Sequence, residues 1–492
     1  MGIIQRDSLR VSIISYAGAA IGYLNKIFLF TNFLESEEVG LVNLMVTVSL
    51  IYAQLSALGG RNIILRFFPF FSDLRKNQHG FLTGVMAIIL GGFTVITILF
   101  VLVRRPLAGL YVDSSPLLVE YAVYIVPMAL ATLFYNIFES YLRCLYRNIL
   151  PTVAHELILR LSVTIAVSLY ALGVIGFGAF VSLYVGAYCV PATLLIIYSV
   201  SRGLAGFTFY IPPLFRRLGR IMIVYGLFLL MNNLSGFLLV SLDSLMVAGM
   251  LDLGAAGVYT TMVFLTSVML IPYRSMVKVA APMVASIWKS KDMDKMQDIY
   301  AKATSGNLVV GASIFMLLWV NLDSVYYFMP AGYQEGRYVF LLLGAGKLFD
   351  MSSGLNSTIL TTSRKYRFDL LFTIAMAGLV FITNLLFIPL WGIEGAAFSS
   401  MLCLVLFNFL RVIFIRYHFN IQPFRGVHLV VILLMAAIMF VSGLTAKLPV
   451  VYADILLRSV TALVLFIVPV WLIRVSPELN AWAGGIISRF GR

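Results

Sequence analysis

The sequence predicts an all-α polytopic membrane protein, and three observations lead to this fold class. Hydrophobic residues make up 61% of the 492 residues, charged residues make up 11%, and the mean hydropathy is +0.98. Soluble globular domains carry about 45–50% apolar and about 25% charged residues, so a soluble enzyme with a conventional core is not expected. The apolar residues also form long unbroken runs, whereas outer-membrane barrels show alternating segments of about ten residues.

The length of the chain sets the expected number of membrane-spanning helices. A helix needs about 20 apolar residues to cross the bilayer, so the chain accommodates roughly 12 to 14 spans. We expect about fourteen helices joined by short loops, at about 11–32, 39–60, 80–102, 117–139, 151–172, 176–200, 221–249, 254–276, 303–328, 338–361, 369–390, 394–418, 428–446 and 452–474. No loop between them is long enough to hold a folded soluble domain.

The positive charges predict the orientation of the chain in the membrane. With the N-terminus inside, the cytoplasmic segments hold 27 of the 35 Lys and Arg residues. The opposite side holds only Arg104, Arg105, Arg337 and Lys447. Because Lys and Arg concentrate in cytoplasmic loops, this distribution predicts that both termini are cytoplasmic. The net charge of +14 is therefore attributed first to topology and not to nucleic-acid binding.

Two pairs of junctions indicate an internal duplication. Gly40 opens the second predicted helix and Gly257 opens the eighth, 217 residues later. Gly173 precedes the sixth helix and Gly392 precedes the twelfth, 219 residues later. The similar offsets predict two pseudo-symmetric six-helix lobes, a recurrent plan among transporters. We assign the lobes to 1–210 and 211–420, and two added helices with a cytoplasmic tail to 421–492.

Ionisable residues inside the spans of the first lobe are candidates for function, because a charge at a helix centre costs about 2.5–3.5 kcal/mol on insertion scales. Helix one carries Gly18, Gly22 and Lys26 on one face, and the lysine either lines a cavity or snorkels to the outer headgroups. Helix five carries Glu156 and Arg160 at a spacing of four. These two either form a local structural pair or offer a basic group to an anionic substrate.

Helix two has a milder polar face made of Asn43, Thr47 and Gln54. Polar residues spaced along one face of a transmembrane helix usually hydrogen-bond to a neighbouring helix. We expect that role for this face.

Helix seven places Asn232, Gly236 and Asp243 on one face. Subtracting the repeat offset of 217 from 243 gives 26, so the duplication puts Asp243 and Lys26 at equivalent depths. An ion pair between them could latch the outer side of a central cavity. The alternative is that Asp243 lies in the outer interfacial region, and a charge swap of the two residues would distinguish these readings.

Helix ten carries the longest polar stripe, formed by Lys347, Asp350, Gly354, Ser357 and Thr361. Lys347 and Asp350 can pair along one face, and both lie too deep for easy snorkelling. They are candidates for a cavity or for coupling transport to an ion, with a purely structural buried pair as the alternative.

Sequence signatures of catalysis are weak. The sequence has no GxGxxG loop and no Walker motif, and its three cysteines have no disulfide or metal-binding spacing. Asp292-Met293-Asp294 resembles the Asp-x-Asp of glycosyltransferases, but it stands in a solvated mixed-charge run. We therefore expect neither an enzyme nor a resident metal or cofactor, while a coupling ion, H⁺ or Na⁺, stays open.

The junction of helices seven and eight resembles that of the polysaccharide-transport and O-antigen-type flippases of the multidrug/oligosaccharidyl-lipid/polysaccharide (MOP) exporter superfamily. That junction has an aspartate before a Leu-Met run, followed by Gly-Ile/Val-Tyr. The matching residues here are Asp243, Leu245, Met246, Gly257, Val258 and Tyr259. Glu37 to Leu41 and Pro282 resemble two further family positions, whereas Ser244 replaces the usual basic residue after the aspartate.

The resemblance implies a flippase that moves an undecaprenyl-diphosphate oligosaccharide across the bacterial inner membrane, by alternating access, for surface polysaccharide or lipopolysaccharide assembly. Its implied partners are the lipid-linked substrate, membrane lipids and other polysaccharide-assembly proteins, with no nucleic acid. Lys26, Arg160, Lys347 and Asn232 are the candidate substrate-binding residues, and Asp243, Asp350 and Glu156 are the candidate coupling or gating residues. A multidrug or cation antiporter of the same superfamily ranks second, and a membrane polysaccharide polymerase or ligase ranks third.

Overall fold

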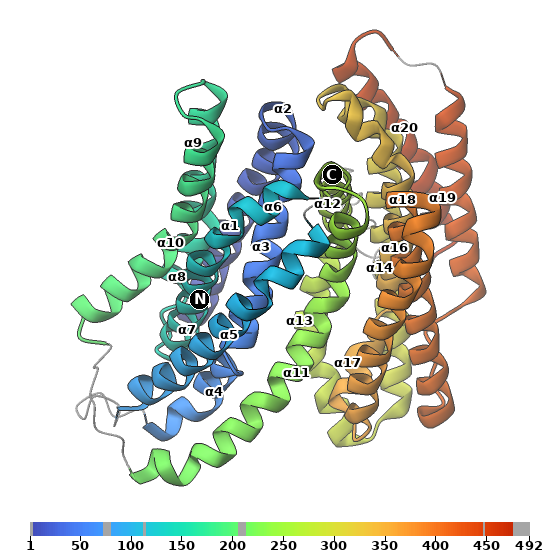
Figure 1. Cartoon of the computed structure of the whole chain (residues 1–492). Coiled ribbons are helices and arrows are strands. Elements are labelled where there is room, and N and C mark those ends of the chain that lie inside the picture. The colour runs from blue at the N-terminus through green and yellow to red at the C-terminus, as the bar shows by residue number, and fades with distance from the viewer. Residues whose placement is uncertain (1–2, 72–79, 112–114, 205–212, 446–447, 476–492) are drawn as a thin grey trace. The chain divides into compact units, whose positions relative to one another are not determined.

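A computed structural model describes residues 3–71, 80–111, 115–204, 213–445 and 448–475 (Figure 1). Every regular element in these ranges is a helix, which confirms the predicted all-α class. Within these described ranges, ten helices are long and apolar enough to cross a membrane, or up to eleven if one bent pair counts as a single span. The count of fourteen helices stays a prediction. The cytoplasmic placement of both termini also stays a prediction, and residues 1–2 and 476–492 lie outside the described ranges.

The chain divides into two compact units, 1–257 and 258–492. The predicted boundaries at 210 and 420 stay predictions. The helices of unit 1 are α1 (Ile3–Tyr23), η1 (Leu24–Leu29), α2 (Phe30–Phe33), α3 (Ser36–Ser56), α4 (Gly60–Phe67), η2 (Phe68–Phe71), α5 (Phe81–Tyr111), α6 (Pro116–Tyr121), η4 (Ala122–Tyr124), α7 (Ile125–Cys144), α8 (Ile149–Val153), η5 (Ala154–Ile158), α9 (Leu159–Ala171), α10 (Phe177–Ser201), α11 (Pro213–Met250) and the start of α12 (Leu253–Ser267).

Unit 2 begins within α12 and ends with a pair of adjacent helices, α19 and α20 (Figure 1). Its further helices are α13 (Leu270–Ser290), α14 (Met293–Val320), α15 (Leu322–Tyr327), η6 (Ala331–Gly336), α16 (Arg337–Ser352), α17 (Asn356–Thr362), α18 (Tyr366–Phe419), α19 (Gly426–Leu444) and α20 (Val451–Leu472). Asp292 of the Asp-x-Asp sequence caps α14, because its carboxylate accepts a hydrogen bond from the backbone N–H of Lys295 at 3.0 Å.

The junction glycines of the predicted duplication adopt similar backbone conformations. Gly173, between α9 and α10, has a φ of 70°, and Gly392, which breaks α18 into two arms, has a φ of 57°. Both values lie in the region that favours glycine over residues with a Cβ atom. The chain thus changes direction at equivalent places in the two repeats.

The other pair of repeat glycines makes a reciprocal contact within unit 1. A Cβ on Gly40 of α3 would clash with the carbonyl oxygen of Leu253, and a Cβ on Gly257 of α12 would clash with that of Ser36. Each added Cβ would also stand 3.1 Å from the backbone nitrogen of the other glycine. Because Ser36 and Leu253 are also 217 residues apart, the contact obeys the repeat symmetry. Only residues without side chains permit this approach of two helix backbones.

Two of the expected spans are interrupted. The expected helix at 338–361 ends at Ser352 and resumes at Asn356, because Gly354 has a φ of 67°. The polar stripe from Lys347 to Thr361 therefore does not follow one continuous helix, and that expectation was wrong. The expected helix at 254–276 is also broken, since α12 and α13 meet at a bend of 50°.

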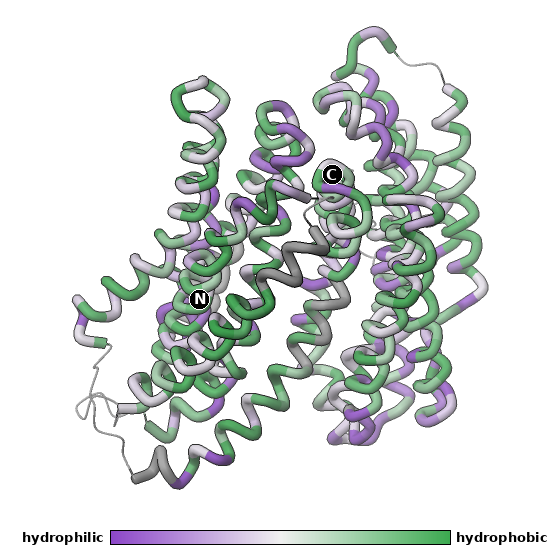
Figure 2. The backbone as a smooth tube through the Cα atoms, in the orientation of Figure 1, coloured by the Kyte–Doolittle hydropathy of each residue, from purple (hydrophilic) through white to green (hydrophobic). Residues whose placement is uncertain are grey.

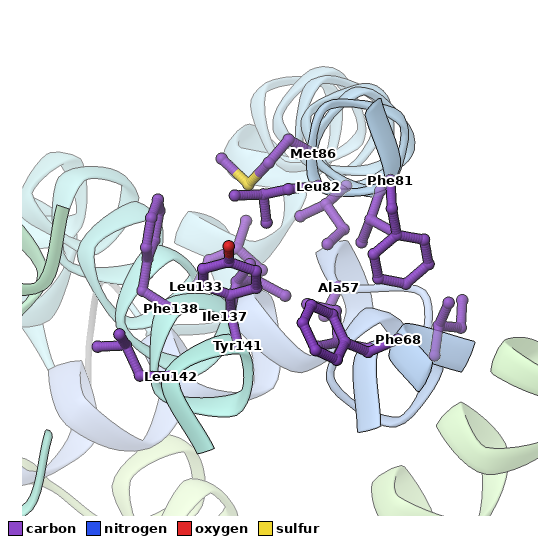
Figure 3. Packing of buried hydrophobic residues seen from close by; sticks show 14 of the residues in the cluster. Ala57, Phe68, Phe81, Leu82, Met86, Leu133, Ile137, Phe138, Tyr141 and Leu142 are labelled. Atoms are coloured by element: carbon purple, nitrogen blue, oxygen red, sulfur yellow. The ribbon is translucent and has the colours of Figure 1, made fainter. Parts of the chain in front are cut away.

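Hydrophobic residues run along most of the length of the helices (Figure 2). Many large apolar side chains are exposed and many others are buried, as expected for a chain embedded in a bilayer. Unit 1 nevertheless has a dense internal core where α3, α4, α5 and α7 meet. Its aromatic members include Phe68, Phe81 and Tyr141, which pack edge-to-face with ring centroids 5.7 to 6.3 Å apart (Figure 3). This core fixes the positions of α3 and α7 relative to one another.

Candidate functional site

Unit 1 places two of the predicted site residues in π-helical segments. Among the described residues such segments occur at η1, which contains Lys26, and at η5, which contains Glu156. The two segments lie close together, because η5 packs on α1 and η1 packs on α9. π-Helical turns occur frequently at functional sites, since they widen the helix and redirect side chains.

The glycines of helix one make room for the charged residues of helix five. A Cβ on Gly18 would stand 2.5 Å from the carbonyl oxygen of Glu156, and a Cβ on Gly22 would meet the guanidinium of Arg160. Arg160 donates a hydrogen bond to the carbonyl oxygen of Gly18 and pairs with Glu156 at 2.5 Å. Arg160 thus packs against the glycine face of α1, formed by Gly18 and Gly22.

A buried asparagine joins the same two helices. The Asn25 side chain is 3% exposed, donates to the carbonyl oxygen of Arg160 at 2.9 Å and accepts from the Thr164 hydroxyl at 2.8 Å. Both ends of this amide are therefore satisfied, which fixes the depth of η1 against α9.

Lys26 leaves η1 toward α3 and donates a hydrogen bond from Nζ to Asn43 Oδ1 at 2.7 Å. The polar face of α3 is thus used for a contact with helix one at Asn43, as expected for helix-to-helix bonding. Lys26 as a whole is half-buried.

Two predicted residues lie on α11. Asp243, which belongs to unit 1, is 4% exposed. Asn232 is also on α11, but its side chain lies outside the described part of the structure. The ion pair between Lys26 and Asp243 stays a prediction.

In unit 2, Lys347 contacts the end of α12, next to the bend between α12 and α13. From α16, its Nζ donates to the carbonyl oxygen of Val263 at 3.0 Å and to the Thr266 hydroxyl at 2.7 Å. Both acceptors belong to the last turns of α12, whose carbonyl end attracts a positive charge. Among the described residues no carboxylate pairs with Lys347, so the expected pair with Asp350 is not formed.

Asp350 points instead into an amide network between helices. Its Oδ1 accepts from Asn408 Nδ2 at 2.9 Å, and Asn408 Oδ1 accepts from Asn356 Nδ2 at 2.8 Å. Asn408 is fully buried and Asn356 is 1% exposed, so these hydrogen bonds are shielded from water. Asp350 thereby ties α16 to the second arm of α18 and to α17.

Beside this network lies a buried ion pair that joins the two arms of α18. Arg411 pairs with Asp369, and the two side chains are 8% and 11% exposed. The Arg411 guanidinium also stacks on Phe407, with its central carbon 3.9 Å from the ring centroid. An ion pair this deep needs such additional contacts, since both charges lose their hydration.

The predicted residues form two separate groups, one in each unit. Lys26, Glu156 and Arg160 are neighbours in unit 1, whereas Lys347 and Asp350 share unit 2. Whether the groups face one common cavity stays a prediction.

Solved structures share this fold over nearly their whole length. The lipid II flippase MurJ, in an inward closed conformation, aligns with a TM-score of 0.70 at 13% identity, covering 94% of this chain and 98% of that one. An inward-facing multidrug resistance MATE family transporter of the MOP superfamily aligns with a TM-score of 0.59 at 14% identity, covering 84% and 97%. The Vibrio cholerae MATE transporter VcmN aligns with a TM-score of 0.56 at 13% identity, covering 84% and 96%.

The chain therefore has the fold of these MOP-superfamily transporters. No protein-family model matches the sequence, and no curated protein matches it. At 13–14% identity the structural likeness establishes the fold, and the transported substrate has to be argued from the residues.

Sequence reasoning missed the groups that surround Asp350. The sequence patterns considered above do not single out Arg411, Asp369 or Asn408. One signal could have found the ion pair: Asp369 and Arg411 carry opposite charges and lie at similar sequence distances on either side of Gly392. Two antiparallel arms that meet at Gly392 place such residues at similar depth.

Proposed function

We propose that this protein is a flippase that moves a lipid-linked oligosaccharide, carried on a polyprenyl diphosphate such as undecaprenyl diphosphate, across the bacterial inner membrane by alternating access. The proposal includes a role in surface polysaccharide assembly. The observation that carries it is Lys347, a half-buried cation at a helix break that is held only by neutral oxygen atoms among the described residues.

The chemistry of the substrate explains why such a cation is useful. A diphosphate that leaves the headgroup region loses hydration, and burying an anion without compensation is costly. Among the described residues the hydrogen-bond partners of Lys347 are a carbonyl and a hydroxyl, so no carboxylate competes with an anion for it. Lys347 can exchange neutral acceptors for phosphate oxygens without breaking an ion pair.

The position of Lys347 supports the same function. Transporters commonly build their substrate sites where transmembrane helices are discontinuous, because the freed backbone groups there contact the ligand. The break between α12 and α13 is of this kind, and Lys347 contacts its last carbonyl-bearing turns.

The comparisons favour a lipid-linked substrate over a drug. MurJ, which its title describes as a lipid II flippase, covers 94% of this chain, against 84% for the MATE transporters. We infer that α19 and α20 account for most of this difference. The drug-exporting branch of the superfamily usually carries an acidic residue in helix one, where this chain has Lys26.

Reconstitution tests the proposal directly. The purified protein in liposomes should move a fluorescent oligosaccharide-diphosphate lipid between leaflets, and an H⁺ or Na⁺ gradient should change the rate if Asp350 or Glu156 couples transport to an ion. Efflux of cationic dyes without translocation of the lipid would favour the multidrug antiporter instead.

A cellular measurement separates the flippase from a polymerase or ligase. Loss of a flippase leaves single oligosaccharide units on the cytoplasmic leaflet, whereas loss of a polymerase leaves single units outside. Accumulation outside would contradict the proposal.

A further inference from the structure

Unit 1 contains a pocket at the junction of α3 and α4 that the proposed site does not use. Its volume is about 330 Å³, at the lower end of the range for small-molecule sites, about 300–1,000 Å³. The lining residues come from α3, α4, α7 and the turn between the first two: Ala53, Gln54, Ala57, Gly59, Arg61, Asn62, Leu65, Asn136 and Ile137.

The pocket exists because the backbone turns sharply after α3. Leu58 and Gly59 have φ values of 46° and 75°, so the helix ends at Ser56 and α4 starts in a new direction. A Cβ on Gly59 would clash with Gly226 of α11, so the turn is held tightly against that helix. Arg61 and Asn62, in the first turn of α4, therefore border the same space as Gln54.

The floor of the pocket is rigid and apolar. Ala57 and Ile137 line it and belong to the core of unit 1, where they pack among Phe68, Leu133 and Phe138 (Figure 3). A ligand seated there would therefore meet a fixed apolar surface at one side.

The walls carry three carboxamide side chains, those of Gln54, Asn62 and Asn136. Each is half-buried, and none makes a side-chain hydrogen bond to another described residue. Half-buried carboxamides without protein partners can hydrogen-bond to water or to a ligand. Three of them around one pocket suit a ligand that both donates and accepts hydrogen bonds.

The charges near the pocket restrict the class of ligand. Arg61 lies at the exposed rim, 3.3 Å from Glu139, and Glu139 also pairs with Arg143 at 2.6 Å. The two arginines disfavour a cationic ligand. A bare diphosphate finds only one arginine on the pocket lining, and that arginine already has a carboxylate partner.

We propose that this pocket binds one neutral sugar ring of the transported headgroup, an assignment that rests on the proposed function. Each carboxamide offers a donor and an acceptor, which matches the hydroxyl groups of a pyranose. The apolar floor matches the C–H face of the ring. The volume suits a single ring, so the rest of an oligosaccharide extends beyond the pocket.

Ligand-observed saturation-transfer NMR tests this site on the full-length protein. The protein is reconstituted in phosphatidylcholine nanodiscs, whose headgroups carry no hydroxyl groups, and the probes are methyl β-glucoside and N-acetylglucosamine. We expect saturation transfer to at least one sugar. Gln54→Leu and Asn136→Leu should lower it at least fivefold, because each replaces an amide by an apolar group of similar size.

The matched control is Asn32→Leu, which removes an exposed carboxamide of α2 outside the pocket and should leave the signal unchanged. Asn62→Ala on α4 gives a third pocket variant if either leucine variant fails to fold, as judged by its thermal unfolding midpoint. Equal signals in wild-type protein and folded pocket variants, or no signal in the wild type, would overturn the proposal.

Two further arms connect the site to transport. A lipid-linked oligosaccharide that contains the bound sugar should displace the free sugar, whereas sodium pyrophosphate should not. Displacement by pyrophosphate alone would overturn the assignment to a sugar, and a lipid-linked sugar that fails to compete would overturn the assignment to the transported headgroup.

Sugar binding and lipid translocation are measured separately, so the two proposals can fail independently. A wild-type protein that translocates the lipid but binds no sugar refutes the pocket alone. A protein that binds sugar through the pocket but translocates no lipid-linked oligosaccharide supports the pocket as a sugar site and refutes the flippase.

Discussion

Two ion pairs, Arg160–Glu156 in unit 1 and Arg411–Asp369 in unit 2, are built in different ways. In unit 1, Arg160 and its partner Glu156 lie on the same helix, and their side chains are 26% and 23% exposed. In unit 2, Arg411 and Asp369 come from different arms of α18 and are 8% and 11% exposed. A pair within one helix forms with that helix, whereas a pair between arms depends on the packing of the whole hairpin.

Lys26 of unit 1 and Lys347 of unit 2 also differ in the kind of partner they contact. Lys26 reaches one carboxamide on the adjacent α3, whereas Lys347 reaches the end of a broken helix. The difference teaches that Lys347 and Arg411 of unit 2 lie at a helix end and a helix crossing, where small movements change their partners. Arg160 of unit 1 instead packs against Gly18 and Gly22, and its backbone carbonyl accepts a hydrogen bond from Asn25. Unit 2 also contains a pair within one helix, Arg458 and Asp454 of α20.

The largest expected effect comes from removing one partner of the buried pair. Asp369→Ala should lower the free energy of unfolding by about 3–5 kcal/mol, because Arg411 is left charged and buried. Glu156→Ala should cost less, since Arg160 is more exposed. Chemical denaturation of the purified protein in detergent measures both. The double variant Asp369→Leu/Arg411→Met should recover most of the loss, and equal effects of the two single variants would contradict the comparison.

Transport should depend more strongly on the lysine of unit 2. Lys347→Met removes a charge-assisted contact with the substrate worth about 1.5–3 kcal/mol, so translocation of the lipid-linked oligosaccharide should fall by about 10- to 100-fold. Lys347→Arg should retain part of the activity. Lys26→Met is the matched variant in unit 1, and the liposome assay measures all three. Unchanged translocation by Lys347→Met would remove the main support for the proposed function.

The close packing of Gly18 against the backbone of Glu156 in unit 1 can be tested by adding one methyl group. Gly18→Ala should destabilise the protein by about 1–3 kcal/mol, because the new Cβ would press on the backbone of Glu156. Gly91→Ala is the control, since nothing lies within 4 Å of its Cβ position and alanine favours the helix. A shift of the thermal unfolding midpoint that is the same for both would show that the close approach is not required.

The smallest expected effect concerns a neutral contact in unit 2. His428 of α19 is 4% exposed and bonds through Nε2 to the Ser305 hydroxyl at 2.8 Å. Its Nδ1 accepts the backbone N–H of Arg425 at 3.2 Å, so Nε2 carries the proton and donates to Ser305. Ser305→Ala should cost about 1 kcal/mol in unfolding free energy. If Ser305→Ala lowered the unfolding free energy as much as Asp369→Ala, buried charge would not decide which contacts stabilise the protein most.

Spacing on one helix predicts contacts only in part. The spacing of Glu156 and Arg160 gave their pairing as one of two readings, and the pair is present. Lys347 and Asp350 also share one helix, but they bond to different partners. The partners of Lys347 were not predictable from its spacing, although Pro272 in the first turn of α13 marks the place where a new helix starts. Helix periodicity carries no information on where a span bends under tertiary packing.

The pocket of unit 1 shows the same limit. Gln54 was visible in the sequence as part of a polar face on helix two, and the expected role was bonding to a neighbouring helix. Asn62 lies on α4, and the backbone reversal at Leu58 and Gly59 brings it to Gln54, whereas Asn136 lies on α7 and reaches Gln54 because α7 packs on α3. Residues that meet through a turn of this kind cannot be grouped by their spacing.

The crossing of Gly40 and Gly257 has an evolutionary consequence. Gly40 contacts Leu253, and Gly257 contacts Ser36, which is the equivalent of Leu253 in the repeat. The contact is therefore isologous, like the centre of a twofold symmetric homodimer. A shorter ancestor with a single repeat could make this crossing with a second copy of itself, using one glycine twice. If two such copies fused, the chain would carry this glycine twice, as Gly40 and Gly257. Each of them is needed for the close contact between the backbones of α3 and α12.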